Sequence, residues 1–458
     1  MKDSTHVFRK IIRDGVEIRI KNKRYSVRYP RYAWGKFPKS LHRAFADALA
    51  YIATWHLSLA TETKIVYHFP HPPIESVFSK IILYTIPMNI FETKNAKTSE
   101  LIKKYYNASF QTRFKGLNFS YSGKKVKRLL KNRALLLFSF GKDSLLSYGL
   151  LKELGLSVIP FFMKEPQSLI ENTQKQKLAD AFYDKLGDDV EFFPLSIGRL
   201  RQNRGYFWGW DIILSQYAFV LIPYYFYSQS KYLFFGNEQS CNFFTTDNEG
   251  YFVNPVFEQS ISAMQLLQDL PKLFQIKTHI GSLVEPVHEI FITYILHHRY
   301  PQVGKFQMSC FAYGGKNGRK RWCGQCEKCG RMYIYFKALN INPERVGFYT
   351  NNMLSLKKEK YYPIFSRGAS SAYGGSGLGK DEQLIAFYLA YKNGIKGELI
   401  DKFKKLYLKE VKKRKFKLIE EYFGVHSSYS LPSTLRTRTL KILKKEREDV
   451  LKYVRRVI

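Results

Sequence analysis

Apolar and polar residues follow several patterns along the chain, and each pattern predicts one kind of element. In the first 130 residues, VEIRI (16–20) and RYSVRYP (24–30) alternate as short strands do. SLHRAFADALAYIATWHLSLA (40–60) has apolar residues at helical spacing, and KIVYHFP (64–70) and KIILYTIPM (80–88) have the composition of strands. The region 1–130 is therefore expected to form a small α+β domain.

The region 131–350 combines continuous apolar runs of strand length with helical segments. ALLLFSF (134–140) is typical of a strand that is buried on both faces of a parallel sheet, and a helical segment follows it at once. SVIPFFM (157–163) is a second such strand, and 212–235 is expected to be a buried helix followed by another strand. This alternation predicts the α/β class, with a doubly wound parallel sheet.

The last region, 351–458, begins with a Gly/Ser-rich segment, SSAYGGSGLGKDE (370–382), that is expected to be a loop. Beyond it the pattern is helical, and residues 391–458 contain 20 Lys and Arg against 8 Asp and Glu. Such a basic helical region is either a solvated face or a contact surface for nucleic acid or phosphate. Both interpretations stay open at this point.

Composition adds a charge question to this picture. The chain has 458 residues, of which 45% are hydrophobic and 16% aromatic, as expected of a folded protein. Its formal net charge is +36, which fits either a polyanionic partner such as tRNA or a generally basic, soluble protein. No apolar signal segment opens the chain, and the run 212–235 is interrupted by polar residues. A cytoplasmic protein without a membrane segment is expected.

The motif FSFGKDS (138–144) lies between the predicted strand and the helix after it. A helix N-terminus presents unpaired N–H groups and a partial positive charge, which suit a phosphate group. Gly141 lets the backbone approach an anion, Lys142 supplies a cation, and Asp143 can hold Mg²⁺ or cap the helix. The spacing is not that of a Walker A loop. The candidate phosphate-binding residues are Ser139, Phe140, Gly141, Lys142, Asp143 and Ser144.

Four of the five cysteines lie between positions 310 and 329, with the spacing C-x12-C-x2-C-x2-C. Four thiolates are a sufficient tetrahedral set for a structural Zn²⁺ in a reducing compartment. An iron–sulfur cluster and a redox dithiol are the alternatives. The expected zinc ligands are Cys310, Cys323, Cys326 and Cys329.

The glycine-containing motif resembles the SGGxDS loop of the PP-loop ATP pyrophosphatases, which have a HUP-like sheet. Ser139, Gly141, Asp143 and Ser144 match that loop, whereas Phe140 stands where the family has glycine. This departure is expected to narrow the loop or to alter its turn. A PP-loop followed by a late cysteine cluster is similar to 7-cyano-7-deazaguanine synthase, an enzyme of queuosine biosynthesis. That resemblance implies ATP and Mg²⁺ as reactants, Zn²⁺ as a structural ion, and Asp143, Lys142 and Glu238 as catalytic residues.

Two middle segments, FFGNEQSCN (234–242) and VNPVFEQS (253–260), depart from that enzyme. They resemble a sibling group that includes the ATP-dependent epimerase of the terminal L-glutamate of a UDP-muramoyl dipeptide. GNEQS directly follows a predicted strand, and ligands of doubly wound sheets bind beyond the carboxyl ends of strands. Arg299, Glu285 and Glu289 are further candidates. The expected substrate-binding residues are Asn237, Glu238, Ser240, Asn254, Glu258 and Ser260.

The resemblance implies that a substrate carboxylate, or a base oxygen, is activated as an adenylate with release of pyrophosphate. Ammonia would then give a deazaguanine nitrile, whereas deprotonation would give glutamate epimerisation. Sulfur transfer to tRNA is a third outcome within the family. The rival from another class is a non-enzymatic zinc protein that binds nucleic acid, which explains the charge of +36 but not the position of the 138–144 motif.

Overall fold

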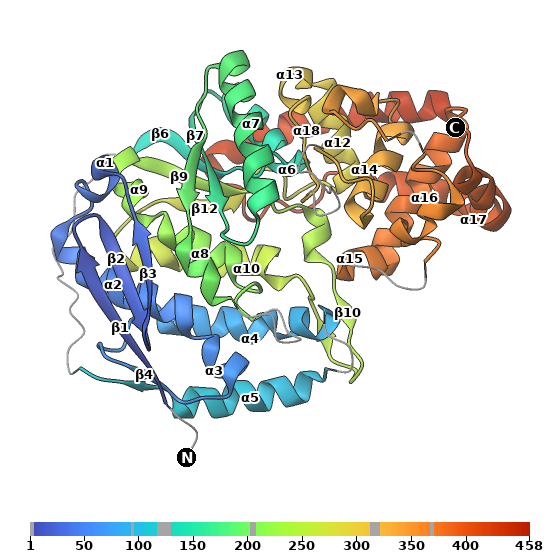
Figure 1. Cartoon of the computed structure of the whole chain (residues 1–458). Helices are drawn as coiled ribbons and strands as arrows, with labels where there is room; N and C mark the ends of the chain where they lie inside the picture. Colours follow the sequence, from blue (N-terminus) through green and yellow to red (C-terminus); the bar gives the residue numbers. More distant parts are fainter. Residues whose placement is uncertain are drawn as a thin grey trace.

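The α/β fold contains two five-stranded sheets, of which one is central and fully parallel (Figure 1). Its strand order is β12-β9-β6-β7-β8, and every neighbouring pair in it is parallel. The computed structural model describes residues 4–92, 96–116, 130–201, 208–311, 321–350, 352–366 and 371–458. The central strands are β6 (Lys131–Leu137), β7 (Ser157–Lys164), β8 (Glu191–Pro194), β9 (Ser230–Phe235) and β12 (His279–Ser282).

Both faces of the central sheet are buried, which is why its strands are continuous apolar runs. Successive side chains of a strand point to opposite faces. Ala134 and Leu136 of β6 belong to one hydrophobic core, and Leu135 between them belongs to another. One core is completed by α6 (Lys142–Glu153), α7 (Leu169–Leu186), α12 (Glu289–His298) and α14 (Glu327–Ala338). The other includes α8 (Ile213–Val220), α9 (Ile222–Ser228), α10 (Ile261–Leu267) and α11 (Asp269–Leu273).

The chain region before residue 130 covers one of these faces. Its mixed sheet has the order β3-β2-β1-β4-β5, with β1, β2 and β3 antiparallel and with β4 parallel to both of its neighbours. Its buried residues share one hydrophobic core with Leu135 and Phe161 of the central sheet. The strands are β1 (Thr5–Ile12), β2 (Gly15–Ile20), β3 (Lys23–Arg28), β4 (Ile65–Tyr67) and β5 (Arg113–Phe114). The helices are α1 (Arg31–Trp34), α2 (Lys39–Thr54), α3 (Leu57–Thr61), α4 (Glu75–Glu92) and α5 (Thr98–Gln111).

One predicted strand of this region is a helix, because KIILYTIPM (80–88) lies within α4. Residues 78, 81, 82, 85, 86, 89 and 90 are buried, at the spacing of one helix face. Two of them, Thr85 and Asn89, are polar and donate hydrogen bonds to the buried carboxylate of Asp211. Leu83 and Tyr84 are apolar but exposed. Polar residues on the buried face and apolar residues on the exposed one therefore conceal the helical period.

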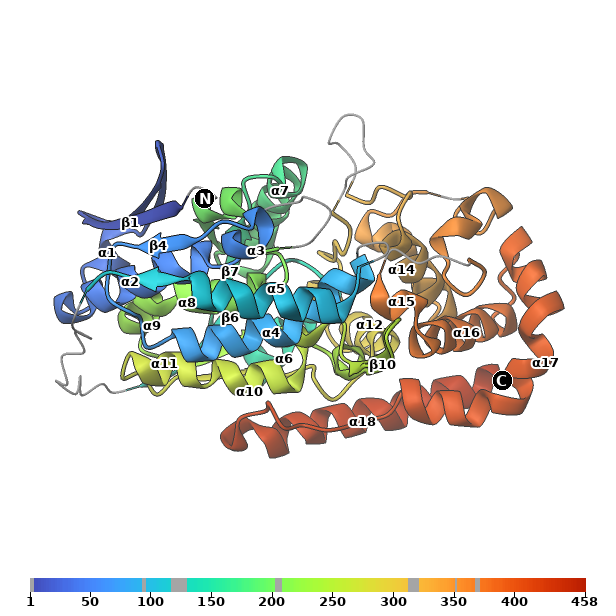
Figure 2. The same ribbon diagram turned by 90° about the horizontal axis from the view of Figure 1, so that it is seen from below.

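The C-terminal region packs against the opposite face and is helical, as expected (Figures 1 and 2). The expected Gly/Ser loop at 370–382 is wrong for its greater part, because two helices begin there. The hydroxyl oxygens of Ser371 and Ser376 accept hydrogen bonds from Gly374 N and Gly379 N and so cap these helices. The helices are α15 (Ala372–Gly375), α16 (Gly377–Lys392), α17 (Glu398–Tyr422) and α18 (Ser433–Val457).

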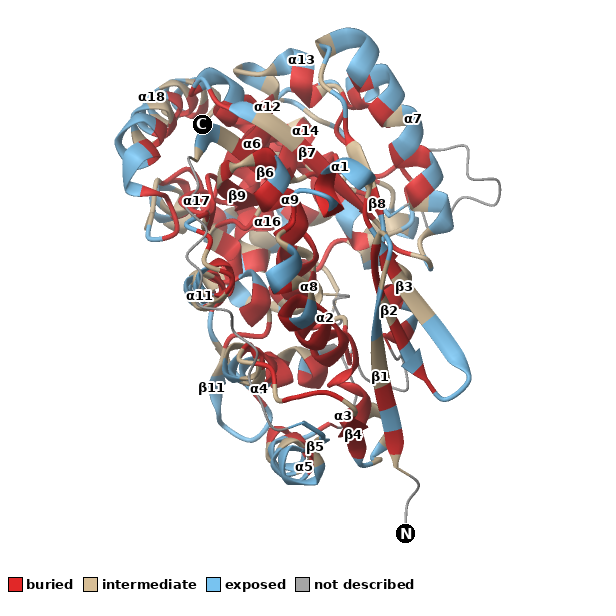
Figure 3. Ribbon diagram, turned by 90° about the vertical axis from the view of Figure 1, so that its left-hand side faces the viewer, coloured by how far each residue is buried: buried red, intermediate tan, exposed pale blue. Residues whose placement is uncertain are grey.

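Burial is highest along the central strands and the helices next to them, whereas the outer faces of α5 and α7 are exposed (Figure 3). The described part of the chain contains no helix of the length and apolarity that a bilayer crossing requires. The described residues also form the hairpin of β10 (Thr245–Thr246) with β11 (Phe252–Val253), the short helix α13 (Pro301–Gly304) and several 3-10 helices.

Candidate active site and metal centre

The site lies where the winding of the central sheet changes direction. The chain runs outward from β6 through β7 to β8 and then returns to β9 on the other side of β6. The helices after β6 and β9 lie on opposite faces, so a crevice forms beyond the carboxyl ends of these two strands. The 138–144 segment, here called the glycine loop, follows β6, and residues 236–240 follow β9. Both sequence motifs therefore meet at this point of the sheet.

The glycine loop is held in shape by its two serines. Gly141 is the N-cap residue of α6 and donates its N–H to Ser139 Oγ over 3.3 Å. Ser144 Oγ accepts a bond of 3.2 Å from Ser139 N and donates one of 3.1 Å to Gly141 O. The loop thus reaches the N-terminus of a twelve-residue helix with its backbone fixed by local contacts.

Phe140 has a left-handed backbone conformation, and its side chain does not line the cavity. Its φ is +56°, in the left-handed region that favours glycine. Its side chain is fully buried and packs edge-on against Phe138 and Phe182 in the core. The expectation that Phe140 narrows the loop is therefore wrong. Aromatic packing offsets the backbone strain of about 1–2 kcal/mol that a non-glycine residue carries there.

Residues 236–240 approach the glycine loop so closely that a side chain at position 236 would collide with it. A Cβ atom at Gly236 would lie 2.8 Å from Asp143 Cβ and 3.2 Å from Ser144 N. Glycine is required here because the two segments pack backbone to backbone. This close approach brings Glu238 next to Lys142 and Asp143.

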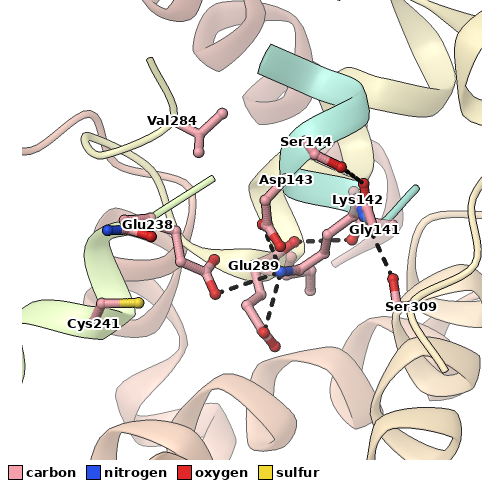
Figure 4. Close-up of polar contacts among 12 residues, drawn as sticks. Gly141, Lys142, Asp143, Ser144, Glu238, Cys241, Val284, Glu289 and Ser309 are labelled. Atoms are coloured by element: carbon pink, nitrogen blue, oxygen red, sulfur yellow. Dashed lines mark hydrogen bonds and ion pairs between the residues drawn. The ribbon is translucent and has the colours of Figure 1, made fainter. Parts of the chain in front are cut away.

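The Lys142 ammonium group lies among three carboxylates (Figure 4). Its Nζ is 2.7 Å from Asp143 Oδ1, 3.4 Å from Glu238 Oε1 and 3.1 Å from Glu289 Oε1. Burial lowers the pKa of Lys142, but the three carboxylates outweigh burial and raise it well above its usual value. The ammonium group therefore stays charged and neutralises part of an acidic cluster.

The three carboxylates are not equivalent. Burial raises the pKa of Glu289, but Arg331 and Lys142 outweigh it, and the pKa falls to about 2. Burial raises the pKa of Asp143, and it raises that of Glu238 well above the usual range. Glu289 is thus the fixed anion of the cluster, whereas Asp143 and Glu238 gain most from a further cation.

A cavity of about 310 Å³ opens beside this cluster. It is lined by the glycine loop and the residues after β9, and also by the segment before Cys310, by α14 and by the start of α15. Basic and acidic groups both face it. A larger cavity of about 570 Å³ lies in the N-terminal region, but it lacks such a convergence of buried charges. The charged residues lining the smaller cavity are Lys142, Asp143, Glu171, Lys175, Glu238, Glu289, Lys328 and Arg331.

Lys175 joins the glycine loop to the segment that leads into the cysteines. Its Nζ donates hydrogen bonds to the carbonyl oxygens of Ser139 and, over 2.6 Å, of Met308. Met308 N in turn donates to Phe140 O over 2.7 Å. Burial lowers the pKa of Lys175 to about 8, although Glu171 opposes the shift. A buried lysine thus fixes two backbone segments against each other.

The cysteine cluster, Cys310, Cys323, Cys326 and Cys329, forms a compact group that can hold a zinc ion. Its ligand atoms all lie within 4.8 Å of one another, and the Sγ pairs 310–326 and 323–329 are 4.0 and 3.7 Å apart. A tetrahedral site with Zn–S bonds of about 2.3 Å needs sulfurs about 3.8 Å apart. Backbone N–H groups of Cys323 and Cys329 donate to sulfur atoms of the cluster. The donor set and the spacing fit zinc.

The structure brings most of the predicted site residues together. Ser139, Gly141, Lys142, Asp143, Glu238 and Ser240 line the cavity, while Ser144 supports the loop and Phe140 lies in the core. Asn237 is buried, and its carbonyl oxygen accepts a hydrogen bond of 2.6 Å from Ser282 Oγ.

Three predicted substrate ligands make internal contacts instead of lining the cavity. Asn254 donates to Cys241 O over 2.9 Å, and Glu258 Oε1 accepts from Ser215 N over 2.8 Å near the start of α8. Ser260 caps α10 through Ala263 N. Substrate contact by Asn254, Glu258 and Ser260 stays a prediction.

The further candidates Arg299 and Glu285 also make internal contacts. Arg299 pairs with Glu153 and Glu446. Glu285 accepts hydrogen bonds from the backbone N–H groups of Tyr429 and Ser430.

Sequence reasoning missed several groups that line the cavity, chiefly Lys175, Lys328, Arg331 and Tyr373. For Lys175 a signal exists, because Ala179 and Phe182 follow it at helical spacing on the buried face of α7. Arg331 lies two residues after the last cysteine and pairs with Glu289 over 2.8 Å. Tyr373 carries no such signal, because its position depends on how the C-terminal helices fold back.

No known protein family matches the sequence, and a search of curated proteins found none that is similar to it. The functional assignment therefore rests on the geometry of the site and on the motif resemblance given above.

Proposed function

We propose that the chain is an ATP-dependent enzyme of the PP-loop type that activates a substrate carboxylate as an adenylate and releases pyrophosphate. The observation that carries the proposal is the glycine loop. It caps a long helix at the carboxyl end of the central strand, where the sheet changes winding direction, and three carboxylates surround Lys142 beside it. Phosphate groups bind at such helix N-termini.

In this proposal the first-turn N–H groups of α6 and the hydroxyl group of Ser139 bind the phosphates of ATP. Asp143 and Glu238 are the carboxylates that would hold Mg²⁺, since both are buried beside the glycine loop; burial raises the pKa of each, and neighbouring carboxylates add to the shift. When bound, Mg²⁺ supplies charge neutralisation of the phosphate oxygens. Glu289 keeps the Lys142 ammonium group and the Arg331 guanidinium in place.

The proposed reaction is the transfer of an adenylyl group from ATP to a substrate carboxylate. A carboxylate oxygen of the substrate attacks the α-phosphorus of ATP, the bond from that phosphorus to the α,β-bridging oxygen breaks, and pyrophosphate leaves with the bond electrons. Lys328 carries positive charge at the cavity and attracts a carboxylate-bearing substrate. The sequence resemblance favours a 7-carboxy-7-deazaguanine substrate, and the GNEQS segment favours a UDP-muramoyl dipeptide.

The test is ATP consumption by the purified protein with Mg²⁺, with AMP and pyrophosphate quantified against ADP and phosphate. AMP formation that requires 7-carboxy-7-deazaguanine and ammonia supports the first substrate, and AMP formation with a UDP-muramoyl dipeptide supports the second. Asp143→Asn is expected to lower AMP formation at least about 100-fold, because the cluster loses one of the two carboxylates that would hold Mg²⁺. Asp269→Asn, on the exposed surface of α11, is the control and keeps full activity.

An absence of AMP with every substrate, together with an absence of ATP binding, overturns the proposal. In that case the basic C-terminal helices favour a zinc protein that binds nucleic acid. Binding to a tRNA or a DNA duplex that weakens steeply with salt, and that Asp143→Asn leaves unchanged, would identify that class.

A further inference from the structure

Three potential metal ligands that do not line the cavity lie close together where the start of α12 meets the end of α17. His288 is the N-cap residue of α12, Glu421 lies in the last turn of α17, and His426 follows four residues after that helix ends. Their ligand atoms all lie within 4.8 Å of one another. Residues far apart in the sequence thus present two imidazoles and a carboxylate to one point.

The hydrogen bond of His426 fixes which of its nitrogens is available. Its Nε2 lies 2.8 Å from the backbone carbonyl oxygen of Glu421. A carbonyl only accepts, so Nε2 carries the proton and, in the neutral ring, Nδ1 keeps its lone pair. Imidazoles that bind metals commonly donate their second ring nitrogen to a backbone carbonyl in this way.

His288 is buried and presents one ring nitrogen, Nε2, to Glu421. Its side chain is 2% exposed, and its Nε2 lies 3.2 Å from Glu421 Oε1. Its Nδ1 is buried and has no hydrogen-bond partner in the part of the chain that the structure describes. An unpaired buried nitrogen costs about 1–3 kcal/mol. A metal ion shared with Glu421 would bind Nε2 instead, so the ring would carry its proton on Nδ1 and this cost would remain.

Glu421 provides the open side of the group. Its side chain is 42% exposed, and among the described residues its ion pair is with His288 alone. The rings of His288 and His426 are perpendicular, with centroids 5.0 Å apart. Ligands around a tetrahedral zinc lie about 3.4 Å apart. The three ligand atoms, at most 4.8 Å apart, would reach this spacing by a small adjustment of the side chains, and the exposed Glu421 leaves the group open to solvent on its side.

We propose that His288, Glu421 and His426 bind one divalent transition-metal cation, distinct from the ion of the cysteine cluster. Two imidazole nitrogens and a carboxylate oxygen suit zinc, with water as the fourth ligand. The ion fastens the end of α17 to the residue before Glu289, and Glu289 pairs with Lys142 and Arg331. The second ion therefore stabilises the charged cluster from outside the cavity, whatever reaction the cavity performs.

The test is a metal count on the full-length protein after equilibration with micromolar zinc and gel filtration. Two zinc ions per chain are expected for the wild type, and one for His426→Ala and for Glu421→Gln, because loss of a direct ligand weakens binding more than loss of an outer-shell partner, which itself costs about 10–100-fold. His71→Ala, an exposed histidine with an acidic neighbour, is the matched control and keeps two. His288 is buried, so the other two variants decide the test if His288→Ala does not fold.

Cobalt distinguishes the two sites by spectrum. Added to protein whose cysteines hold zinc, Co²⁺ is expected to give weak visible absorption without a near-ultraviolet thiolate charge-transfer band, and His426→Ala is expected to abolish it. The proposal is overturned if the wild type holds only one zinc per chain. It is also overturned if the second ion persists in both His426→Ala and Glu421→Gln.

Discussion

The cysteine cluster and the charged group around Lys142 are neighbours in the structure, but they differ in how far apart their residues lie in the sequence. All four cysteines lie within twenty positions, and the spacing alone predicts the group that the structure shows. The groups around Lys142 come instead from the ends of β6 and β9, from α12 and from α14. The cysteine cluster can thus be recognised locally, whereas the charged cavity depends on the topology of the sheet.

The two sites are also joined, and removal of a cysteine gives the largest expected effect. Cys326→Ser is expected to lose the zinc ion and most of the protein's thermal stability, because structural zinc contributes roughly 10 kcal/mol or more to small metal-stabilised folds. Met308 and Ser309, next to Cys310, bond to the glycine loop, so ATP binding should be lost as well. Zinc content and calorimetry check this outcome.

Cys241→Ala is the control for zinc content, since Cys241 lies outside the cluster and should leave the count unchanged. Retention of zinc and of ATP binding by Cys326→Ser would show that the two sites are independent.

Phe140 tests how the glycine loop tolerates a large residue in a left-handed conformation. Phe140→Ala should cost about 3–5 kcal/mol through the cavity left in the core. Phe140→Gly leaves a similar cavity but relieves about 1–2 kcal/mol of backbone strain, so it should be the more stable of the two by about 1 kcal/mol. Urea unfolding measures the difference.

The matched pair at Phe138, which packs in the same aromatic group at negative φ, should show the reverse order. There the glycine variant should be less stable than the alanine variant by about 0.5–1 kcal/mol. If the glycine and alanine variants have the same order of stability at positions 138 and 140, backbone strain is excluded as the cause.

Glu258 tests the opposite case, a residue that was predicted from a local motif but that does not line the cavity. Burial raises its pKa from 4.5 to about 8. The folded chain therefore holds a proton that the unfolded chain has lost between these pH values, and the free energy of unfolding should fall as pH rises through this window. The slope for one proton is at most about 1.4 kcal/mol per pH unit.

Glu258→Gln keeps an acceptor for Ser215 N and should flatten that slope, whereas Glu100→Gln on the exposed face of α5 should not. Denaturant unfolding at several pH values between 5 and 8 provides the measurement. A slope that is the same in wild type and Glu258→Gln would assign the pH dependence to other groups.

A substitution of Lys175 has the smallest expected effect, and it tests the link between the glycine loop and the segment before Cys310. Lys175→Met removes both bonds from Nζ to the carbonyl oxygens of Ser139 and Met308, and ATP affinity should fall about tenfold while zinc is retained. Calorimetric titration with ATP and Mg²⁺ measures this change. Lys177→Met, exposed on the same helix, should bind ATP as the wild type does.

Much of the fold could be predicted because local patterns agree with it. The apolar runs at β6, β7 and β9 are buried on both sides, and the α/β class follows from them. The prediction failed at α4, where Thr85 and Asn89 face inward to bond Asp211. It failed again at Ser371 and Ser376, whose hydroxyl groups cap helices instead of forming a loop.

Prediction of the candidate site from the sequence was limited for a different reason. The glycine loop and Glu238 were predictable because each follows a strand, and parallel strands end at the same edge of a sheet. Lys175 and Arg331 belong to helices and are brought to the cavity by helix packing, so the sequence indicates at most that Lys175 lies on the buried face of α7. Asn254 and Ser260 make a turn contact and a helix cap, and their contact with a substrate stays a prediction.

The central place of β6 also affects how the chain emerges from the ribosome. Ala134 pairs with Val158 on one side and with Tyr232 on the other, and the second partner is synthesised 74 residues after the first. At about 5–20 residues per second this interval lasts about 4–15 s. During it, a nascent chain ending near residue 200 carries an apolar strand with an unpaired edge. Such an edge is a template for aggregation, so this stage of synthesis is where chaperone binding would matter most.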